Sequence, residues 1–378
     1  MAPVILFSYF HGQTENPSWR GRRRTAVSQR LDPMNFNCRE SLLKGHAIPA
    51  VPLALTSGRK WDENSQAALI RYYVDAGAGG LAVGVHSTQF AIRSPKVGLF
   101  RPVLELAAGE ARAWSGERKP LCLIAGLCGL TKQAVFEGQL ARGLGYHAGL
   151  LSLGALSGSP EPQIIKHCRE VARTIPLVGF YLQPAAGGLV LSRRFWNQFC
   201  EIENVVAVKI APFNRYRTVD VVRAVLETER DDVALYTGND DNIVADLMTP
   251  FTFNGRTRFI DGGLLGHWGI WTRRAIELFD EIRVARRRKL ISRRWLEKGA
   301  AITDANAAIF DPANDFRGCI PGIHEVLRRQ GLIKSAACLD PEERLSPGQA
   351  SAITRVTKTY PWMCDDAFVA RNLERWRA

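Results

Sequence analysis

The chain has 378 residues, of which 46% are hydrophobic, so it can bury a sizeable core. No apolar run approaches the ~20 residues that a membrane-spanning helix needs. The formal net charge of +13 could attract nucleic acid or steer anionic substrates, but no nucleic-acid-binding motif accompanies it. We therefore expect neither a membrane nor a nucleic acid among the partners of this protein.

Residues 1–40 are predicted to form a basic, poorly ordered N-terminal extension. The cluster Arg20 to Arg24 lies in a segment rich in Ser, Asn, Gln and Pro, a composition typical of disorder. The short apolar run Val4 to Phe7 lacks a basic leader, which argues against a secretory signal. The eight cysteines show no C-x-x-C pair and no disulfide-like spacing, which predicts reduced thiols and a cytoplasmic protein.

From residue 41 onward, apolar runs alternate with amphipathic segments. The predicted strands are 47–55, 80–84, 121–125, 148–153, 177–181, 205–210, 233–236 and 258–261. The predicted helices between them include 64–75, 102–114, 132–144, 162–174, 191–200 and 219–226. Eight strands alternating with helices indicate an α/β fold, a (β/α)8 TIM barrel, over residues 41–290. Residues 291–378 are predicted to be a helical C-terminal region, interrupted near residues 311–321.

A second basic cluster, Arg283 to Arg294, falls on a predicted helix at the end of the barrel. A charge run of this kind is typical of a solvated helix face or of a contact between subunits. We therefore do not interpret it as a nucleic-acid site.

One predicted strand contains a lysine. Val205 to Ile210 is apolar and β-branched except for Lys209, and the run stops at Ala211-Pro212. Lys209 therefore lies at the C-terminal end of a buried strand. Because desolvation penalises an ammonium, such a lysine tends to lose its proton, and a neutral amine is a nucleophile toward carbonyl groups. The alternative is that the stem packs on apolar neighbours while the ammonium reaches water.

The preceding predicted strand ends in Tyr181 and breaks at Pro184 and Gly187-Gly188. A strand, a helix and a second strand form a βαβ unit, so the two strands are expected to be parallel and adjacent. Tyr181 and Lys209 should then emerge at the same end of the sheet, with both side chains pointing into the barrel. A phenol beside an amine can provide the proton transfers that imine formation requires. Both residues are predicted to be catalytic.

The two motifs carry a resemblance to a known family. Tyr181-Leu182-Gln183-Pro184, followed one βα unit later by Val208-Lys209-Ile210, resembles the dihydrodipicolinate synthase / N-acetylneuraminate lyase family of class I aldolase-type barrels. Thr237-Gly238-Asn239-Asp240 resembles the Ser-Gly-Asp-Asp turn of that family. The resemblance covers residues 45–290 and implies a covalent Schiff base on Lys209 with a 2-oxo acid, no other cofactor, and a homo-oligomer (dimer or tetramer). No His, Asp or Glu cluster has the spacing of metal ligands, so no metal is expected.

The family binds the substrate carboxylate with a Gly-Thr-Thr-Gly-Glu motif, and this chain departs from it. The corresponding residues are Gly84, Val85, His86 and Ser87, whose backbone N–H groups are expected to hold the carboxylate. His86 could serve as an acid/base group or merely hydrogen-bond a loop.

Further substrate contacts are expected from a second set of residues: Gly238, Asn239 and Gly263. Asn239 and Asp240 could instead cap the following helix.

Two other departures concern specificity. The synthase has an arginine after the tyrosine motif, and this chain has Ala185 to Gly188 in its place. The synthase also has a tyrosine contributed by a neighbouring subunit, and this chain has Leu153 to Gly158 at that position. A bidentate arginine clamp cannot be replaced by alanine or glycine without losing carboxylate binding. If synthase activity survives, Arg215 or Arg217 would have to supply the clamp.

Three functions remain open. The favoured one is a Schiff-base-forming lyase or aldolase that cleaves or forms a carbon–carbon bond, or dehydrates a 2-oxo acid, through a lysine iminium. Authentic dihydrodipicolinate synthase (a hydro-lyase) is disfavoured by the missing arginine. A non-catalytic descendant that binds a small anion is disfavoured by the presence of Lys209, which such a protein would not need.

Overall fold

The computed structural model describes residues 36–116 and 121–378, and residues 1–35 of the predicted N-terminal extension lie outside them. The core is an eight-stranded parallel sheet in the order β1-β10-β7-β6-β5-β4-β3-β2. Its strands are β1 (Ala47–Pro49), β2 (Gly80–Val83), β3 (Cys122–Leu127), β4 (Ala148–Leu151), β5 (Leu177–Leu182), β6 (Val205–Ala211), β7 (Ala234–Thr237) and β10 (Gly262–Leu265). A single bridge between Ala50 and Ala82 joins β1 to β2 and completes the ring. The predicted (β/α)8 barrel is confirmed.

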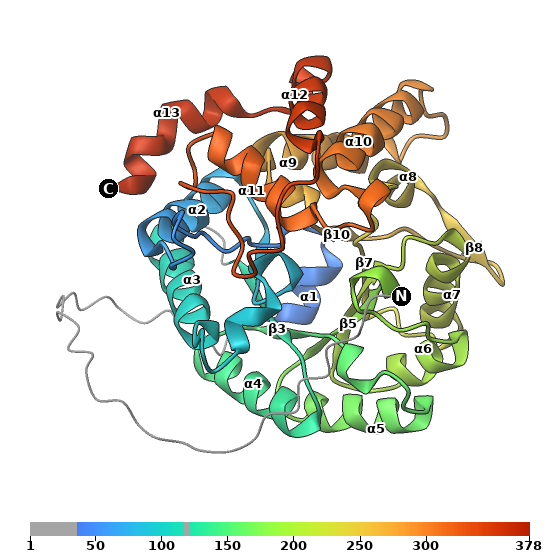
Figure 1. The fold of residues 1–378 in the computed structure, drawn as a ribbon. Helices are drawn as coiled ribbons and strands as arrows, with labels where there is room; N and C mark the ends of the chain where they lie inside the picture. Colours follow the sequence, from blue (N-terminus) through green and yellow to red (C-terminus); the bar gives the residue numbers. More distant parts are fainter. Residues whose placement is uncertain (1–35, 117–120) are drawn as a thin grey trace. The chain divides into compact units, whose positions relative to one another are not determined.

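Helices surround the strands (Figure 1). They are α2 (Glu63–Ala76), α3 (Phe100–Ser115), α4 (Thr131–Gly143), α5 (Glu161–Ala172), α6 (Arg193–Cys200), α7 (Arg215–Glu227), α8 (Ile243–Met248) and α9 (Thr272–Ala285). The ends of α2 illustrate how the sequence sets such boundaries. Asp62 caps its first turn by accepting from Ser65 N–H, and Gly77, with φ of 98°, ends it in the left-handed conformation.

The eighth barrel strand differs from the prediction. Residues 256–258 form β9 (Arg256–Arg258), which pairs antiparallel with β8 (Phe251–Phe253) in a separate two-stranded sheet. The strand that enters the barrel is β10, which begins with two glycines. A Cβ on Gly262 would lie 2.4 Å from the carbonyl oxygen of His46, and one on Gly263 would lie 2.6 Å from the Trp268 ring. Close packing therefore selects glycine, whose low strand propensity hides β10 in the sequence.

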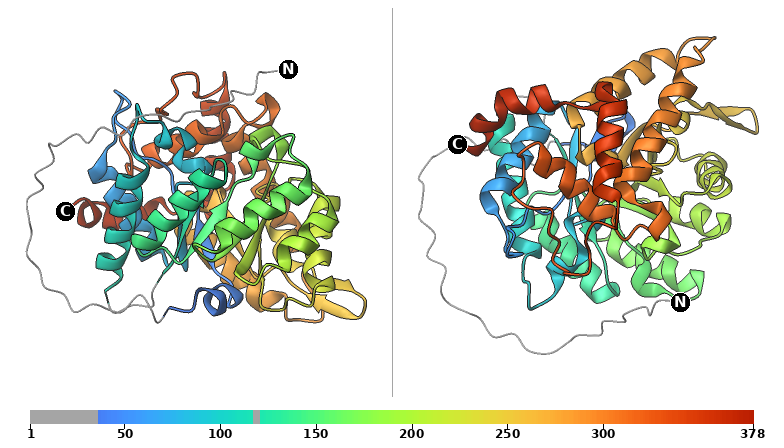
Figure 2. Two further views of the ribbon diagram at one scale, coloured as in Figure 1. Left: turned by 90° about the horizontal axis from the view of Figure 1, so that it is seen from below. Right: turned by 45° about the horizontal axis from the view of Figure 1, so that its top comes forward.

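The C-terminal region is helical, as predicted (Figure 2). It comprises α10 (Arg294–Phe310), α11 (Cys319–Arg329), α12 (Gln349–Thr359) and α13 (Asp366–Arg377). Helix α13 packs against α2 of the barrel. The Tyr72 hydroxyl donates to Asp365 at 2.7 Å and accepts from Thr272 N–H at 2.7 Å, so buried hydrogen bonds join the two parts. Within the described residues, no helix is both long and apolar enough to cross a membrane.

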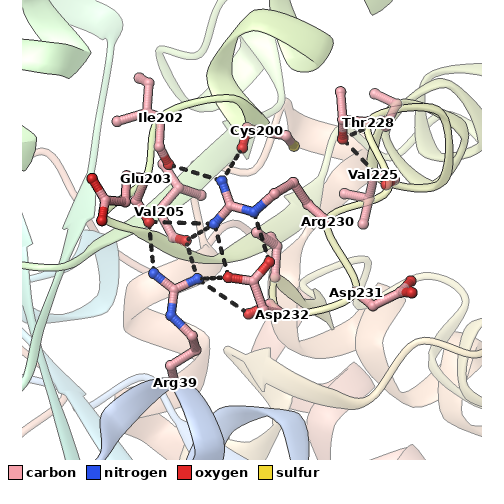
Figure 3. Close-up of polar contacts among 12 residues, drawn as sticks. Arg39, Cys200, Ile202, Glu203, Val205, Val225, Thr228, Arg230, Asp231 and Asp232 are labelled. Atoms are coloured by element: carbon pink, nitrogen blue, oxygen red, sulfur yellow. Dashed lines mark hydrogen bonds and ion pairs between the residues drawn. The ribbon is translucent and has the colours of Figure 1, made fainter.

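A pair of arginines stabilises the opposite, N-terminal end of the barrel, where α1 (Cys38–Leu43) contacts β3, β6 and β7 (Figure 3). Arg230 donates to the carbonyl oxygens of Cys200, Ile202 and Val205 and forms an ion pair with Asp232. Arg39 of α1 pairs with the same carboxylate and donates to the carbonyl oxygen of Val205 at 3.1 Å. The two side chains therefore satisfy carbonyl groups at the start of β6 and hold α1 against the barrel.

We expect Arg230→Ala to lower the free energy of unfolding by about 2–4 kcal/mol, because it leaves several part-buried carbonyl groups without donors. Urea denaturation would measure this loss. The exposed Arg287 provides a matched control, and Arg287→Ala should change stability by less than about 0.5 kcal/mol. Equal stability of the two variants would show that the arginine pair does not stabilise this end of the barrel.

A candidate active site at the C-terminal mouth of the barrel

A cavity of about 480 Å³ opens at the C-terminal ends of the strands. Loops after β2, β5, β6 and β7 line it together with the C-terminal region, and this is the end at which barrel enzymes place their catalytic residues. Its lining includes Val85, His86, Ser87, Phe180, Lys209, Phe213, Gly238, Asp240, Phe316, Arg317, Glu342 and Glu343. Residues 36–116 and 121–378 contain no group of three or more His, Cys, Asp or Glu side chains that could hold a metal ion.

Lys209 points into this cavity and is 8% exposed. Its Nζ lies 4.4 Å from the centroid of the Phe180 ring and forms no hydrogen bond or ion pair with any described residue. Burial lowers the pKa of Lys209 to about 8, although the nearby Asp240 carboxylate acts in the opposite direction. About a tenth of the amine is therefore neutral at pH 7, and the alternative in which the ammonium reaches bulk water is not observed.

Gly238 makes room for this lysine. A Cβ at position 238 would lie 2.5 Å from Cε of Lys209, so any side chain there would displace the amine. Gly238, predicted as a substrate contact, lines the cavity, and its observed role toward Lys209 is steric.

Tyr181 does not face Lys209, contrary to the prediction. Its hydroxyl donates to the carbonyl oxygen of Leu191 at 3.0 Å and accepts from the N–H of the same residue at 3.3 Å. Its ring packs 5.0 Å from that of Trp196 on α6, outside the barrel. Phe180 occupies the inward position instead, because successive residues of a strand point to opposite faces.

A register shift explains this exchange. At the start of the strands Leu177 pairs with Val205, but the next residue, Val178, pairs with Ala207. Val206 is therefore an extra residue in β6, a β-bulge. Beyond it, Phe180 pairs with Lys209 and Tyr181 with Ile210. Without the bulge, the same counting would pair Tyr181 with Lys209, as the motif spacing predicts.

The loop after β2 presents backbone donors to the cavity. Thr88 accepts from the N–H groups of Gly84 (3.0 Å) and Val85 (3.3 Å) and donates to Val51 O, so its hydroxyl fixes the loop. The N–H groups of His86 and Ser87 have no acceptor among the described residues, and both residues line the cavity. Gly84 shapes the turn with φ of 74° but does not itself line the cavity. Two free N–H groups can bind a carboxylate here.

His86 is half-buried beside these donors, and its ring forms no hydrogen bond with a described residue. The ring packs edge-on against Phe90, with centroids 6.0 Å apart. Burial, together with the charge of Lys209, lowers the pKa of His86 to about 4, so the imidazole is neutral. The alternative role as a loop-bonding histidine is not observed.

Besides Gly84, two further predicted substrate contacts do not line the cavity. Asn239 is fully buried, where its side chain accepts from Phe213 N–H at 3.0 Å and donates to Asp246 at 2.9 Å. It therefore joins the loops after β6 and β7. Gly263 packs against the Trp268 ring. Neither Asn239 nor Asp240 caps the next helix, because the N-cap of α8 is Asn242.

Asp240 lines the cavity and is 9% exposed. Its carboxylate accepts from His267 N–H at 2.9 Å, and its carbonyl oxygen accepts from Asn306 of α10 at 2.6 Å. Burial raises the pKa of Asp240 to about 7, although the hydrogen bond from His267 and the charge of Lys209 oppose the rise. From the sequence alone, Asp240 is expected to cap a helix or to contact the distal part of the substrate. Its buried position near Lys209 depends on the conformation of the loop after β7, which the sequence pattern does not reveal.

The C-terminal region forms the outer wall of the cavity. Phe316 packs edge-on against Phe213, with ring centroids 5.7 Å apart. The Leu339 N–H donates to Gln89 at 2.6 Å, which joins this region to the loop after β2. The sequence alone does not reveal these wall residues, because they belong to no recognisable motif.

The two arginines that could replace the carboxylate-binding arginine of the synthase lie outside the cavity. Arg215 forms an ion pair with the buried Asp246, and neither Arg215 nor Arg217 lines the cavity. Within the described part of the chain, Arg317 is the sole arginine in its wall.

Solved structures share this fold. The chain is similar to dihydrodipicolinate synthase from Aquifex aeolicus (20% identity, 85% of this chain and 99% of that chain, TM-score 0.68). It is also similar to N-acetylneuraminate lyase from Fusobacterium nucleatum (18%, 84% and 99%, TM-score 0.66) and to dihydrodipicolinate synthase from Acinetobacter baumannii complexed with pyruvate (18%, 83% and 98%, TM-score 0.68). No protein-family model and no curated protein matches the chain. The predicted resemblance is therefore confirmed at the level of the fold.

The position of Tyr181 changes what its removal should do. If Lys209 forms an imine with pyruvate, Tyr181→Phe should form it at a rate within about threefold of the wild type, because the hydroxyl bonds to Leu191 outside the cavity. Its free energy of unfolding should fall by about 1–2 kcal/mol, because Leu191 loses its hydrogen-bond partner. Borohydride trapping and urea denaturation measure the two effects, with the exposed Tyr216→Phe as the control. A 10²-fold slower reaction at unchanged stability would restore Tyr181 as the proton shuttle.

Proposed function

We propose that this protein is a Schiff-base-forming lyase or aldolase of 2-oxo acids, a diverged member of the dihydrodipicolinate synthase / N-acetylneuraminate lyase family, with Lys209 as the nucleophile. The observation that carries the proposal is a buried lysine without an ion-pair partner among the described residues, at the mouth of the barrel. The solved structures with this fold support it, since two of them are described in complex with pyruvate.

The chemistry begins with the neutral amine. Its lone pair attacks the keto carbon of the substrate and gives a carbinolamine, which loses water to form an iminium. The iminium accepts electrons from the adjacent carbon, so that a carbon–carbon bond can form or break, or water can leave. No cofactor besides this covalent link is needed for these steps.

The substrate carboxylate fits the loop after β2. The free N–H groups of His86 and Ser87 can donate to its two oxygens. The His86 ring is neutral and therefore does not repel the carboxylate. Apolar side chains, among them Val85 and Phe180, line the same part of the cavity. They exclude water from the reacting carbon and strengthen these hydrogen bonds.

The outer wall of the cavity would contact the part of the substrate that lies beyond the 2-oxo acid group. Asp315, Glu342 and Glu343 line it, with Arg317 as the sole cation among the described residues there. An acid-rich wall favours hydroxyl or amino groups over a second carboxylate, which like charges would repel. For this reason we favour a lyase or aldolase over authentic dihydrodipicolinate synthase.

Trapping tests the proposal directly. Incubation with pyruvate followed by borohydride should leave one covalent adduct, which peptide mass spectrometry should locate on Lys209. Lys209→Ala should abolish the adduct, whereas Lys358→Ala, which removes an exposed lysine, should retain it. An adduct on another lysine, or none with any of a panel of 2-oxo acids, would exclude the Schiff-base mechanism and favour the non-catalytic anion-binding alternative.

The lowered pKa of Lys209 predicts the pH dependence of trapping. Only the neutral amine attacks, so on the acidic side the initial rate should rise with pH until the pKa of about 8 is reached. At pH 7 about a tenth of the amine would be neutral, far more than for an ordinary lysine with a pKa near about 10.4. Rates of cyanoborohydride-dependent labelling between pH 6 and 10 measure this midpoint. A midpoint above about pH 10 would show that the amine is not depressed.

A further inference from the structure

The proton transfers of imine chemistry need a group that can both donate and accept. The inward residue beside Lys209 is Phe180, which has no ionisable group, and Tyr181 faces α6. Val85 stands where the family has the first hydroxyl of its carboxylate-binding motif. No phenol therefore lies beside the amine in the described part of the cavity. Another residue must move these protons if Lys209 forms an iminium.

Asp240 is positioned for this task. It lies two residues after Gly238, the glycine that packs against Cε of Lys209. Asp240 and Lys209 line the same cavity. His267 N–H holds one carboxylate oxygen at 2.9 Å. Asn306 holds the backbone of Asp240, and the Asn306 side chain lies 2.7 Å from Nδ1 of His267. This network fixes in place a buried acid that has no ion-pair partner among the described residues.

The separation of the two groups is equally informative. No ion pair within 4.0 Å joins Asp240 to Lys209, yet each influences the charge of the other. A direct ion pair would hold the lysine in its protonated form, which is not nucleophilic. Both residues line the same cavity, so a substrate carbonyl that enters it has the amine and the acid in its surroundings.

We propose that Asp240 is the catalytic acid and base that moves protons for Lys209, an inference that rests on the proposed Schiff-base function. The protonated carboxyl donates to the hydroxyl of the carbinolamine. The carbon–oxygen bond then breaks, its electron pair leaves with water, and the nitrogen lone pair forms the iminium. The resulting Asp240 carboxylate takes a proton from the adjacent carbon or hydroxyl of the substrate, which returns the acid to its initial state.

The electrostatic surroundings allow both forms of this acid near neutral pH. The groups that face Asp240 are Lys209 from β6, His267 after β10, Asp241 in its own loop and Cys319 at the start of α11. Burial lowers the pKa of His267 to about 4 and raises the pKa of the Cys319 thiol, so both are neutral. With a pKa of about 7, Asp240 can give and take a proton without a large free-energy cost.

Exchange of the methyl protons of pyruvate in D₂O tests this role, since it requires proton removal from the iminium and no second substrate. We expect Asp240→Asn to slow the exchange, measured by NMR, by about 10²- to 10⁴-fold. Borohydride should still trap an adduct on Lys209 after long incubation. The exposed Asp280→Asn, which lies outside the cavity lining, should exchange within about threefold of the wild type. Exchange by Asp240→Asn within threefold of the wild type would overturn the assignment.

A second variant separates chemistry from structure. In Asp240→Ala, added formate should restore exchange in proportion to its concentration, whereas chloride should not, because only formate can carry the proton. A variant that still traps pyruvate but gains nothing from formate would overturn the role of Asp240. Absence of an adduct in the wild-type protein would instead refute the proposed function itself, so the two failures are distinguishable.

Discussion

The free-energy cost of burying an amine is the constraint on which the mouth of this barrel depends. Lys209 lies among Phe180, Gly238 and the end of β6, without a counter-ion in direct contact among the described residues. Desolvation lowers its pKa, while Asp240, held at a distance, keeps the shift moderate. Glycine at position 238 gives the side chain its space. The arrangement loses stability in order to keep a reactive amine, which is typical of functional sites.

The barrel architecture can be predicted from the sequence, because its sequence pattern is strong. The alternation of apolar runs with amphipathic segments predicts the barrel, because each βα unit repeats the same pattern. Lys209 stands out in the sequence because a charge inside an apolar strand conflicts with burial. In contrast, the sequence predicts the eighth strand at residues 258–261 instead of β10, because Gly262 and Gly263 pack closely against His46 and Trp268 and carry no strand signal.

The site was less predictable, for a reason that one residue illustrates. Motif spacing assigns Tyr181 to the mouth, but the bulge at Val206 changes which residue of β5 faces Lys209. A bulge changes the hydrogen-bond register between two strands. The valine-rich start of β6 contains no residue pattern that predicts where the bulge lies. Likewise, Asn239 resembles a ligand by its position after β7, although its amide serves to join two loops. Residue type and order along the chain do not distinguish these outcomes.

The outer wall of the cavity has a consequence for the biosynthesis of the protein. Phe316, Arg317 and Glu343 line the cavity, and all three follow the eight strands in the sequence. A ribosome therefore synthesises every strand of the barrel, Lys209 included, before it reaches the residues of the outer wall. The surroundings that bury the amine are complete only after translation has passed the last of these wall residues.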